Sequence, residues 1–284
     1  SHGARTDGMT DTLSVYRNVE HNLNQLVGGF ASNVIYSDPS NHICRICGGP
    51  KSPNYDLCLQ CNRNHARAKN LGSLQLLPYP IRAMVYAPEY SGRKIASQMT
   101  KYMYDYKASS TNTEAINVLK YMLMHALIVH RKCLVKLCGG RDVTAWATVP
   151  STQGAPRDNQ RHPLNALVYP YMAGIPEIKL VPTGSKARRL SLDTFALAEE
   201  YNQSLLQHVL LIDDSWVTGG TVLSAAAAIK QRKALTVTAF CIARIINLDF
   251  CHQICPDTEL FTSARYEQSY CPWLGKPHSL QECL

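Results

Sequence analysis

Apolar side chains recur at steps of three and four residues from Thr10 to about Phe30. This spacing places them on one face of a helix, and Gly28 and Gly29 end the pattern. The apolar positions are Leu13, Tyr16, Val19, Leu23, Leu26, Val27 and Phe30. The sequence therefore predicts an amphipathic helix whose apolar face packs against the rest of the fold.

Downstream of residue 80, short apolar runs alternate with helical patterns. The expected strands cover 83–87, 143–149, 177–181, 209–212 and 235–246, and the expected helices cover 91–106, 112–131, 163–171 and 220–230. Strands that alternate with helices typically form a parallel sheet with helices on both faces. The predicted fold class is α/β, with a parallel sheet flanked by helices.

The composition is that of a globular protein. Of 284 residues, 45% are hydrophobic and 18% are charged, which excludes disordered, collagen-like and coiled-coil chains. Lys and Arg outnumber Asp and Glu by 29 to 21, and the net charge of +8 favours nucleic acid or polyphosphate partners. Because no apolar stretch approaches the roughly 18 residues of a membrane helix and no leader pattern is visible, we expect a cytoplasmic protein with no membrane partner.

The cysteines point to metal binding. Their number, eleven, is odd, which argues against a framework of disulfides. Cys44 and Cys47 form one CxxC pair, and Cys58 and Cys61 form a second pair ten residues later. Each pair fits a tight turn and four thiolates complete a closed tetrahedral site, so the spacing predicts a zinc ribbon with a structural zinc ion. Pairwise disulfides are the alternative.

Cysteines near the C-terminus could supply a second metal site. The first ligands to consider are Cys251, Cys255 and Cys271. Their spacing is irregular, and free thiols packed in loops explain it as well. Cys133 and other cysteines within apolar segments are expected to be small core residues.

The segment from Val209 to Thr221, with the sequence VLLIDDSWVTGGT, carries the most specific candidate chemistry. Four apolar residues form a buried strand, Asp213 and Asp214 follow, and a turn of small residues opens a helix. Ligands of open α/β folds bind at this edge of the sheet, and backbone N–H groups at a glycine turn bind phosphate. The two carboxylates can accept hydrogen bonds from sugar hydroxyls or hold a metal. A strand, turn and helix with a capping Asp is the simpler alternative.

This segment resembles the signature of the phosphoribosyltransferases, from which it departs at Trp216. The four-cysteine module, the strand that ends at Pro150, a basic loop and Cys241 to Arg244 extend the resemblance to the ComF-like branch of that family. The resemblance implies a phosphoribosyltransferase-like fold. It also implies that phosphoribosyl pyrophosphate binds with magnesium, with Asp213 and Asp214 on the ribose hydroxyls.

The resemblance further assigns three loops. The 5′-phosphate is expected on Val217, Thr218, Gly219, Gly220 and Thr221. The pyrophosphate is expected near Ser151, Thr152 and Arg157. Lys186, Arg188 and Arg189 lie where the family often carries a loop that closes over the substrate, so we expect them to stabilise the leaving group or else to be a solvated run of charge. Tyr169, Tyr171 or Trp216 could stack on an acceptor ring.

The implied activity is transfer of a 5-phosphoribosyl group to an unidentified nitrogen acceptor, with release of pyrophosphate. The alternative is a protein without catalysis that senses phosphoribosyl pyrophosphate or a nucleotide and contacts nucleic acid through its basic ribbon, since ComF-like proteins are associated with DNA uptake. A third hypothesis is a degenerate member that serves as a scaffold. The sequence does not specify the oligomeric state.

These observations divide the chain into five segments. They are an expression-vector remnant (1–8), an N-terminal helix (9–42), the zinc ribbon (43–75), the phosphoribosyltransferase-like domain (76–247) and a Cys-rich C-terminal appendage (248–284).

Overall fold

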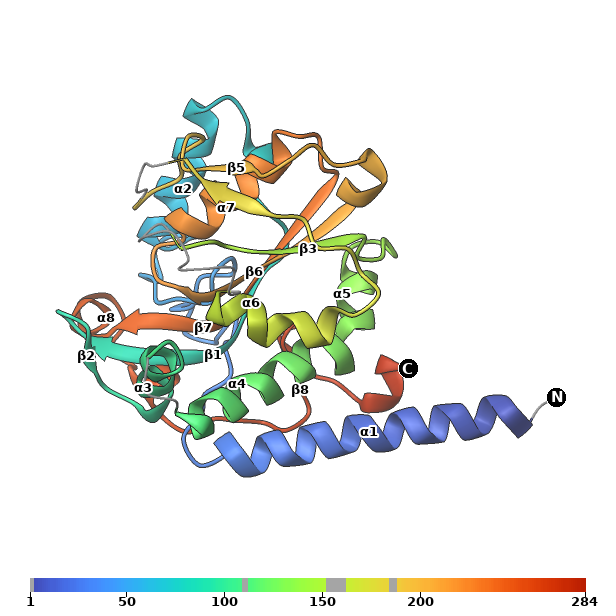
Figure 1. The fold of residues 1–284 in the computed structure, drawn as a ribbon. Helices are drawn as coiled ribbons and strands as arrows, with labels where there is room; N and C mark the ends of the chain where they lie inside the picture. Colours follow the sequence, from blue (N-terminus) through green and yellow to red (C-terminus); the bar gives the residue numbers. More distant parts are fainter. Residues whose placement is uncertain (1–2, 109–111, 152–161, 184–187) are drawn as a thin grey trace.

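A five-stranded, mostly parallel sheet forms the centre of the molecule (Figure 1). The computed structural model describes residues 3–108, 112–151, 162–183 and 188–284. The strand order is β2 (Lys94–Ile95), β1 (Ile81–Tyr90), β7 (Thr236–Asn247), β6 (His208–Trp216) and β3 (Ala145–Thr148). β1, β7, β6 and β3 are parallel to one another, and only β2 runs antiparallel to its neighbour. The predicted α/β class and parallel sheet are confirmed.

Helices and short elements cover both faces of this sheet. The α-helices are α1 (Gly3–Val27), α2 (Leu59–Asn70), α3 (Gln98–Asp105), α4 (Thr113–Met124), α5 (Arg131–Leu137), α6 (Pro163–Val168), α7 (Gly220–Lys230), α8 (Leu248–Ile254) and α9 (Glu259–Thr262). A π-helix, η2 (His125–Val129), joins α4 to α5. The 3₁₀ helices are η1 (Leu74–Leu76), η3 (Tyr169–Met172), η4 (Gln203–Leu206) and η5 (Leu280–Cys283), and two hairpins pair β4 (Leu180–Pro182) with β5 (Phe195–Leu197) and β8 (Tyr270–Cys271) with β9 (Lys276–Pro277).

Alternation along the strands creates two cores. In β6, Val209 and Leu211 face a core that contains α7 and the cysteine module, whereas Leu210 and Ile212 face a core that contains α1 and α4. This period of two follows from the pleat of the strand. Because both faces are covered, β6 and β7 are apolar and buried along most of their length.

Several predicted boundaries shift for local reasons. The helix expected from residue 91 begins at Gln98, because Ser97 caps it by accepting a hydrogen bond from the Thr100 N–H and residues 94–95 pair with β1 instead. The strand expected at 209–212 continues to Trp216. The strand expected at 177–181 is β4, which pairs with β5 outside the main sheet.

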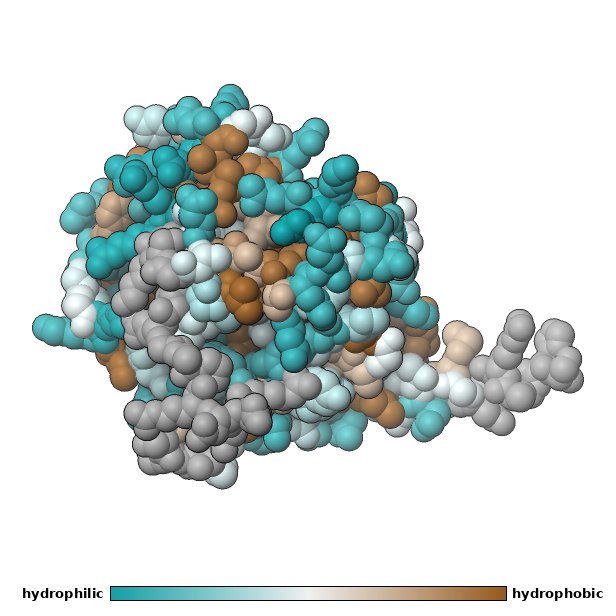
Figure 2. All heavy atoms as spheres, turned by 45° about the horizontal axis from the view of Figure 1, so that its top comes forward, coloured by the Kyte–Doolittle hydropathy of each residue, from teal (hydrophilic) through white to brown (hydrophobic). Residues whose placement is uncertain are grey.

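The two ends of the chain differ in how closely they pack against the rest of the fold. In Figure 1, the N-terminal half of α1 extends past the rest of the molecule, whereas its C-terminal half packs beside α4. The C-terminal segment enters the core, where Trp273 is fully buried and its Nε1 donates to the Ala126 carbonyl at 2.9 Å. Most of the face shown in Figure 2 is hydrophilic, with apolar side chains gathered near its centre. Among the described residues, no helix is long and apolar enough to cross a membrane.

Tyr86 of β1 ties the sheet to the cysteine module. Its hydroxyl donates to the Gly48 carbonyl at 2.5 Å and accepts from the Ile35 N–H at 3.2 Å. We expect Tyr86→Phe to lower the free energy of unfolding by about 1–3 kcal/mol, because the buried Gly48 carbonyl and the half-buried Ile35 N–H both lose their partner. Urea denaturation measures this, with the exposed Tyr90→Phe as the control. Equal stability of the two variants would contradict the role assigned to this hydroxyl.

Candidate functional site

A cavity of about 720 Å³ opens at the carboxyl edge of the sheet, where β6 ends and α7 begins. Its lining residues are Arg93, Lys107, Val149, Pro150, Ser151, His162, Asp213 to Val217, and Thr218 to Val222. Ligands of open α/β sheets bind at this edge. The structure therefore brings the two predicted acids, the predicted phosphate loop and Ser151 to one place. Thr152, Arg157 and Lys186 lie outside the described residues.

The loop between β6 and α7 has a conformation that requires glycine. Gly219 has a φ of +87°, and a Cβ atom there would lie 2.2 Å from the Trp216 ring. A Cβ atom on Gly220 would lie 2.5 Å from the Arg188 carbonyl. The free N–H groups of the first turn of α7 carry partial positive charge, so this turn is suited to bind an anion.

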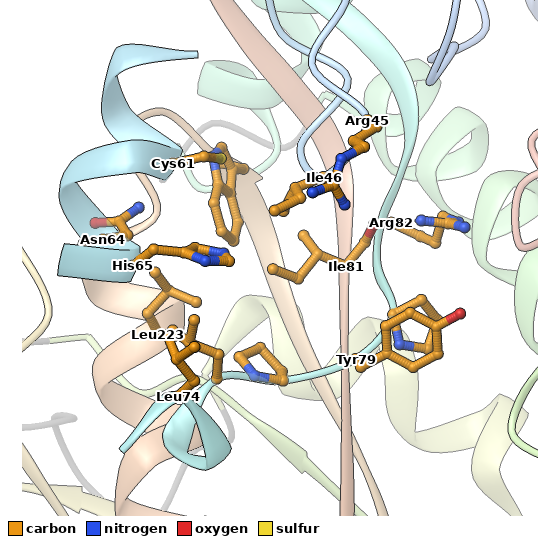
Figure 3. Close-up of a pocket in the computed structure, with 14 residues that line it drawn as sticks. Arg45, Ile46, Cys61, Asn64, His65, Leu74, Tyr79, Ile81, Arg82 and Leu223 are labelled. Atoms are coloured by element: carbon orange, nitrogen blue, oxygen red, sulfur yellow. Dashed lines mark hydrogen bonds between the residues drawn. The ribbon is translucent and has the colours of Figure 1, made fainter. Parts of the chain in front are cut away.

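Trp216, the departure from the family signature, supports this loop. Its side chain is only 2% exposed and packs against Gly219. The indole also lines a second cavity of about 430 Å³, between α2 and the start of β1 (Figure 3). In that cavity His65 of α2 points toward Ile46 and Ile81. Trp216 therefore forms a wall between two cavities, and Tyr169 and Tyr171 do not line the first one.

The two carboxylates have different environments. Asp214 is buried, forms an ion pair with Lys107, and accepts a hydrogen bond from the Tyr106 hydroxyl at 2.8 Å. Burial opposes ionisation, but Lys107 and Tyr106 hold the pKa of Asp214 below its usual range. Burial, followed by the charge of Asp214, raises the pKa of Asp213 well above its usual range. The pair thus favours one charged and one neutral carboxyl group.

Sequence reasoning missed three residues around the acids: Lys107 and His162 line the cavity, and Tyr106 contacts Asp214. Tyr106 and Lys107 directly follow α3, more than 100 residues upstream of the acids that they contact. His162 precedes α6, and burial, followed by the charge of Lys107, lowers its pKa. No local motif marks these residues, because only the fold brings them to the acids.

Arg188 and Arg189 lie beside the phosphate loop. The Thr218 hydroxyl donates to the Arg188 carbonyl at 3.2 Å. Their side chains line a neighbouring cavity of about 580 Å³ together with Arg63 and Arg67 of α2. Thr218 lines both cavities, so the two predicted arginines are adjacent to the acid-lined cavity without lining it.

Cys44, Cys47, Cys58 and Cys61 form a buried cluster in which all four sulfur atoms lie within 4.8 Å of one another. The Cys47 and Cys58 sulfurs are 3.7 Å apart. Thiolates bound tetrahedrally at about 2.3 Å, as in zinc sites, lie about 3.8 Å apart. The four donors therefore fit a tetrahedral metal ion, and the spacing of a disulfide, about 2.05 Å, is absent at this pair.

The turns around the cluster explain its geometry. Cys58 is the N-cap of α2, and its sulfur accepts from the Cys61 N–H at 3.4 Å. Gly48 has a φ of +68°, and its N–H donates to the Cys44 carbonyl at 2.8 Å. Each CxxC pair therefore lies on a tight turn, as the sequence predicts.

Arg244 of β7 connects this cluster to the loop between β6 and α7. Its guanidinium is buried and donates to the Cys47 carbonyl at 3.1 Å and to the Cys47 sulfur at 3.4 Å. It also donates to the Val217 carbonyl at 3.1 Å. Hydrogen bonds from the neighbouring thiols, together with Arg244, hold the pKa of Cys47 well below its ordinary value.

The three C-terminal cysteines named from the sequence do not come together in the structure. Cys251 and Cys255 contact each other in the core that contains α7. Cys271 lies in the other core, together with Cys133. The sheet separates the two groups.

No protein-family model matches the chain, and no curated protein matches it. Two solved structures show a distant likeness. One is an adenine phosphoribosyltransferase, 14% identical with a TM-score of 0.29, which covers 53% of this chain and 92% of that chain. The other is the adenine phosphoribosyltransferase from Saccharomyces cerevisiae with an imino-altritol bisphosphate and adenine, 12% identical with a TM-score of 0.29, covering 59% of this chain and 98% of that chain.

We expect Arg244→Met to weaken metal retention by the four cysteines by about 10- to 100-fold, because the guanidinium no longer balances the thiolate charge. Competition with a chromophoric chelator measures this in the full chain, and circular dichroism checks that the variant is folded. Arg232→Met is the matched control, since Arg232 is exposed. A folded Arg244→Met protein with unchanged metal retention would contradict the role assigned to Arg244 in supporting the cysteine cluster.

Proposed function

We propose that this protein is a magnesium-dependent phosphoribosyltransferase of the ComF-like type, which transfers a 5-phosphoribosyl group from phosphoribosyl pyrophosphate to a nitrogen acceptor. One observation carries the proposal. Two adjacent carboxylates and a glycine turn at the start of a helix line a single cavity at the carboxyl edge of a parallel sheet. A sugar phosphate needs carboxylates to accept hydrogen bonds from its hydroxyls and N–H groups to bind its phosphate, a few ångströms apart.

Different residues of the cavity contact different parts of the ligand. The N–H groups of residues 218–221 bind the 5′-phosphate, and Asp213 and Asp214 accept hydrogen bonds from the two ribose hydroxyls. Carboxylate oxygens are also suitable ligands for magnesium, and the ion would neutralise part of the pyrophosphate charge when it binds with the substrate. Lys107 moves from Asp214 toward the anionic substrate, because the ribose hydroxyls compete for the same carboxylate.

The barrier to transfer depends mainly on how well the departing pyrophosphate is stabilised. The bond between the anomeric carbon and the pyrophosphate oxygen breaks, and the acceptor nitrogen forms the new bond to that carbon. Negative charge grows on the pyrophosphate, so cations placed beforehand lower the barrier. Lys107 within the cavity and Arg188 and Arg189 beside the phosphate loop supply this charge. Ser151 follows β3 at the same edge and contributes to the pyrophosphate side, with Thr152, Arg157 and Lys186 as further candidates.

The four-cysteine cluster is proposed to hold a structural zinc ion. The donor set consists only of sulfur, and four protein ligands leave no open position for a substrate. The ion holds the turn at Cys47, to which Arg244 donates. Because Arg244 also donates to the phosphate loop, the ion helps to hold that loop in place. Cytoplasmic location agrees with this proposal, because thiolate zinc sites need reduced cysteines.

A specific observation favours a second candidate function. The cavity lined by Arg63, Arg67, Arg188 and Arg189 is a cluster of cations on and beside α2. Such a surface suits a sensor that binds phosphoribosyl pyrophosphate or a nucleotide without turnover and contacts nucleic acid. That function predicts binding of single- or double-stranded DNA that weakens steeply with salt and changes when phosphoribosyl pyrophosphate is added.

Calorimetric titration of phosphoribosyl pyrophosphate with magnesium tests the ligand site. We expect the wild-type chain to bind and Asp213→Asn/Asp214→Asn to bind at least about 100-fold more weakly, because two charge-assisted acceptors are lost. Asp56→Asn, an exposed carboxylate outside the cavity, is the control. Absence of wild-type binding, or equal affinity of the double variant, would contradict the proposal.

Binding should also release a proton. Because the pKa of Asp213 is raised, this group is protonated over a wider pH range in the free protein, and the sugar hydroxyls and magnesium require the carboxylate. Affinity should therefore rise as the pH increases through the pKa of Asp213. Titrations in two buffers with different ionisation enthalpies measure the released proton. Identical heats in both buffers would contradict this assignment, and Asp213→Asn should abolish the difference.

A further inference from the structure

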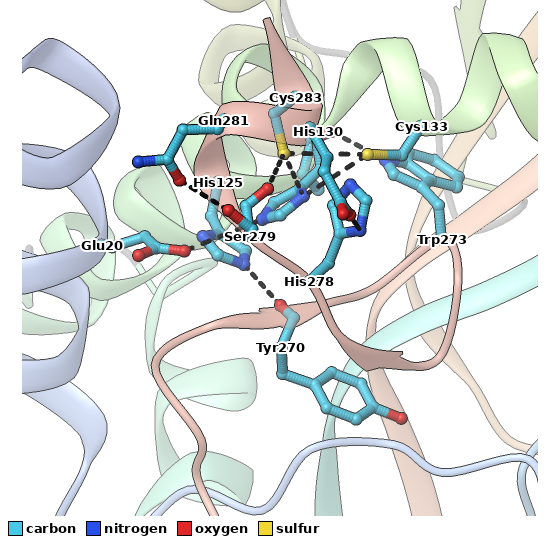
Figure 4. Close-up of polar contacts among 12 residues, drawn as sticks. Glu20, His125, His130, Cys133, Tyr270, Trp273, His278, Ser279, Gln281 and Cys283 are labelled. Carbon is cyan, nitrogen blue, oxygen red and sulfur yellow. Dashed lines mark hydrogen bonds and ion pairs between the residues drawn. The ribbon is translucent and has the colours of Figure 1, made fainter. Parts of the chain in front are cut away.

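A second cluster of metal-binding side chains lies on the other side of the sheet from the four-cysteine cluster. His130, Cys133 and Cys283 place one donor atom each within 4.8 Å of one another, and all three residues are fully buried. Figure 4 shows the two sulfurs and the His130 ring pointing toward one another between α5 and η5. Cys283 lies 150 residues after Cys133, so only the fold brings these groups together.

The distances fit a shared metal ion. The sulfurs of Cys133 and Cys283 are 3.8 Å apart, and His130 Nδ1 lies 3.7 Å from the first and 3.3 Å from the second. For tetrahedral zinc with bonds of about 2.3 Å to sulfur and 2.0–2.1 Å to nitrogen, geometry gives about 3.8 Å between sulfurs and about 3.5 Å between sulfur and nitrogen. A disulfide would bring the sulfurs to about 2.05 Å.

Cys271 is the candidate for the fourth donor. Its side chain is fully buried in the same core as Cys133 and Cys283. Its turn repeats the turn of the four-cysteine cluster. The Gly275 N–H donates to the Cys271 carbonyl at 2.9 Å with Gly275 at a φ of +67°, just as Gly48, at +68°, donates to Cys44 at 2.8 Å.

The surroundings of His130 match those of a histidine ligand. With Nδ1 facing the sulfurs, Nε2 faces Glu20 of α1 at 4.0 Å, and neither this nitrogen nor Glu20 Oε1 has a hydrogen-bond partner among the described residues. A carboxylate behind the second ring nitrogen is the usual support of a metal-bound histidine. The π-helix η2 directly precedes His130, and the His130 N–H donates to the His125 carbonyl at 3.1 Å. Such wide turns often occur at functional sites.

We propose that Cys133, Cys271, Cys283 and His130 bind a second structural zinc ion, with Glu20 orienting the histidine. Three sulfurs and one imidazole form one of the usual closed zinc sites. The ion links α5, the β8–β9 hairpin and η5, and through Glu20 it also reaches α1. It therefore holds the C-terminal segment against the face of the sheet that α1 and α4 cover.

Metal analysis of the full chain, purified without chelators, tests this site. We expect about two zinc ions per wild-type chain and about one in Cys133→Ser/Cys283→Ser. The matched control is Cys251→Ser/Cys255→Ser, which removes the two other C-terminal cysteines and should keep both ions. One zinc ion per wild-type chain would overturn the proposal. Loss of an ion in the control, with none lost in the Cys133→Ser/Cys283→Ser protein, would overturn it as well.

A second measurement does not depend on folded variants. Wild-type protein loaded with ¹¹³Cd should give two NMR signals, one at the shift of a four-sulfur site and one at the shift of a site with three sulfurs and one nitrogen. A single four-sulfur signal would overturn the proposal. Mass spectrometry after alkylation without reductant completes the test: we expect free Cys133 and Cys283 once the metal is removed, and a disulfide between them in freshly purified protein would contradict the site.

Discussion

The buried guanidinium of Arg244 is the contact on which the arrangement of the site depends. It donates on one side to Cys47 and on the other to the carbonyls of Trp216 and Val217, where β6 ends and the loop to α7 begins. A Cβ atom on Gly49 would lie 2.2 Å from its Nη2 atom, so a glycine is needed for the guanidinium to fit. The side chain of one strand residue therefore fixes the position of the cysteine module relative to the loop.

The metal ion proposed for the cysteine cluster explains why this residue is an arginine. Four thiolates around a divalent ion leave a net charge of about −2, and a buried charge of this size needs a partner. The planar guanidinium offers several donors and stays charged. Asn64 of α2 adds a second link, since its side chain donates to the Thr218 carbonyl at 3.1 Å. Arg244 and Asn64 thus link the cysteine module and α2 to the loop between β6 and α7, so loss of the proposed metal is expected to loosen the proposed anion site.

The sequence was informative where the chemistry is local. The strand, the two acids and the glycine turn at 209–221 lie within thirteen residues, and each CxxC pair lies within four, so spacing alone predicts their geometry. It was not informative where the partners are distant. Lys107 and Tyr106 reach Asp214 only because α3 ends beside β6. Cys271 was grouped with Cys251 and Cys255 because they are near in sequence, yet the sheet separates them and the fold places Cys271 in the same core as Cys133.

A crystal structure of the full chain with phosphoribosyl pyrophosphate and magnesium tests the central claim most directly. The account predicts the 5′-phosphate on the N–H groups of residues 218–221, the ribose hydroxyls on Asp213 and Asp214, and Lys107 moved away from Asp214. A ligand bound instead among Arg63, Arg67, Arg188 and Arg189, with Lys107 still paired to Asp214, would contradict it.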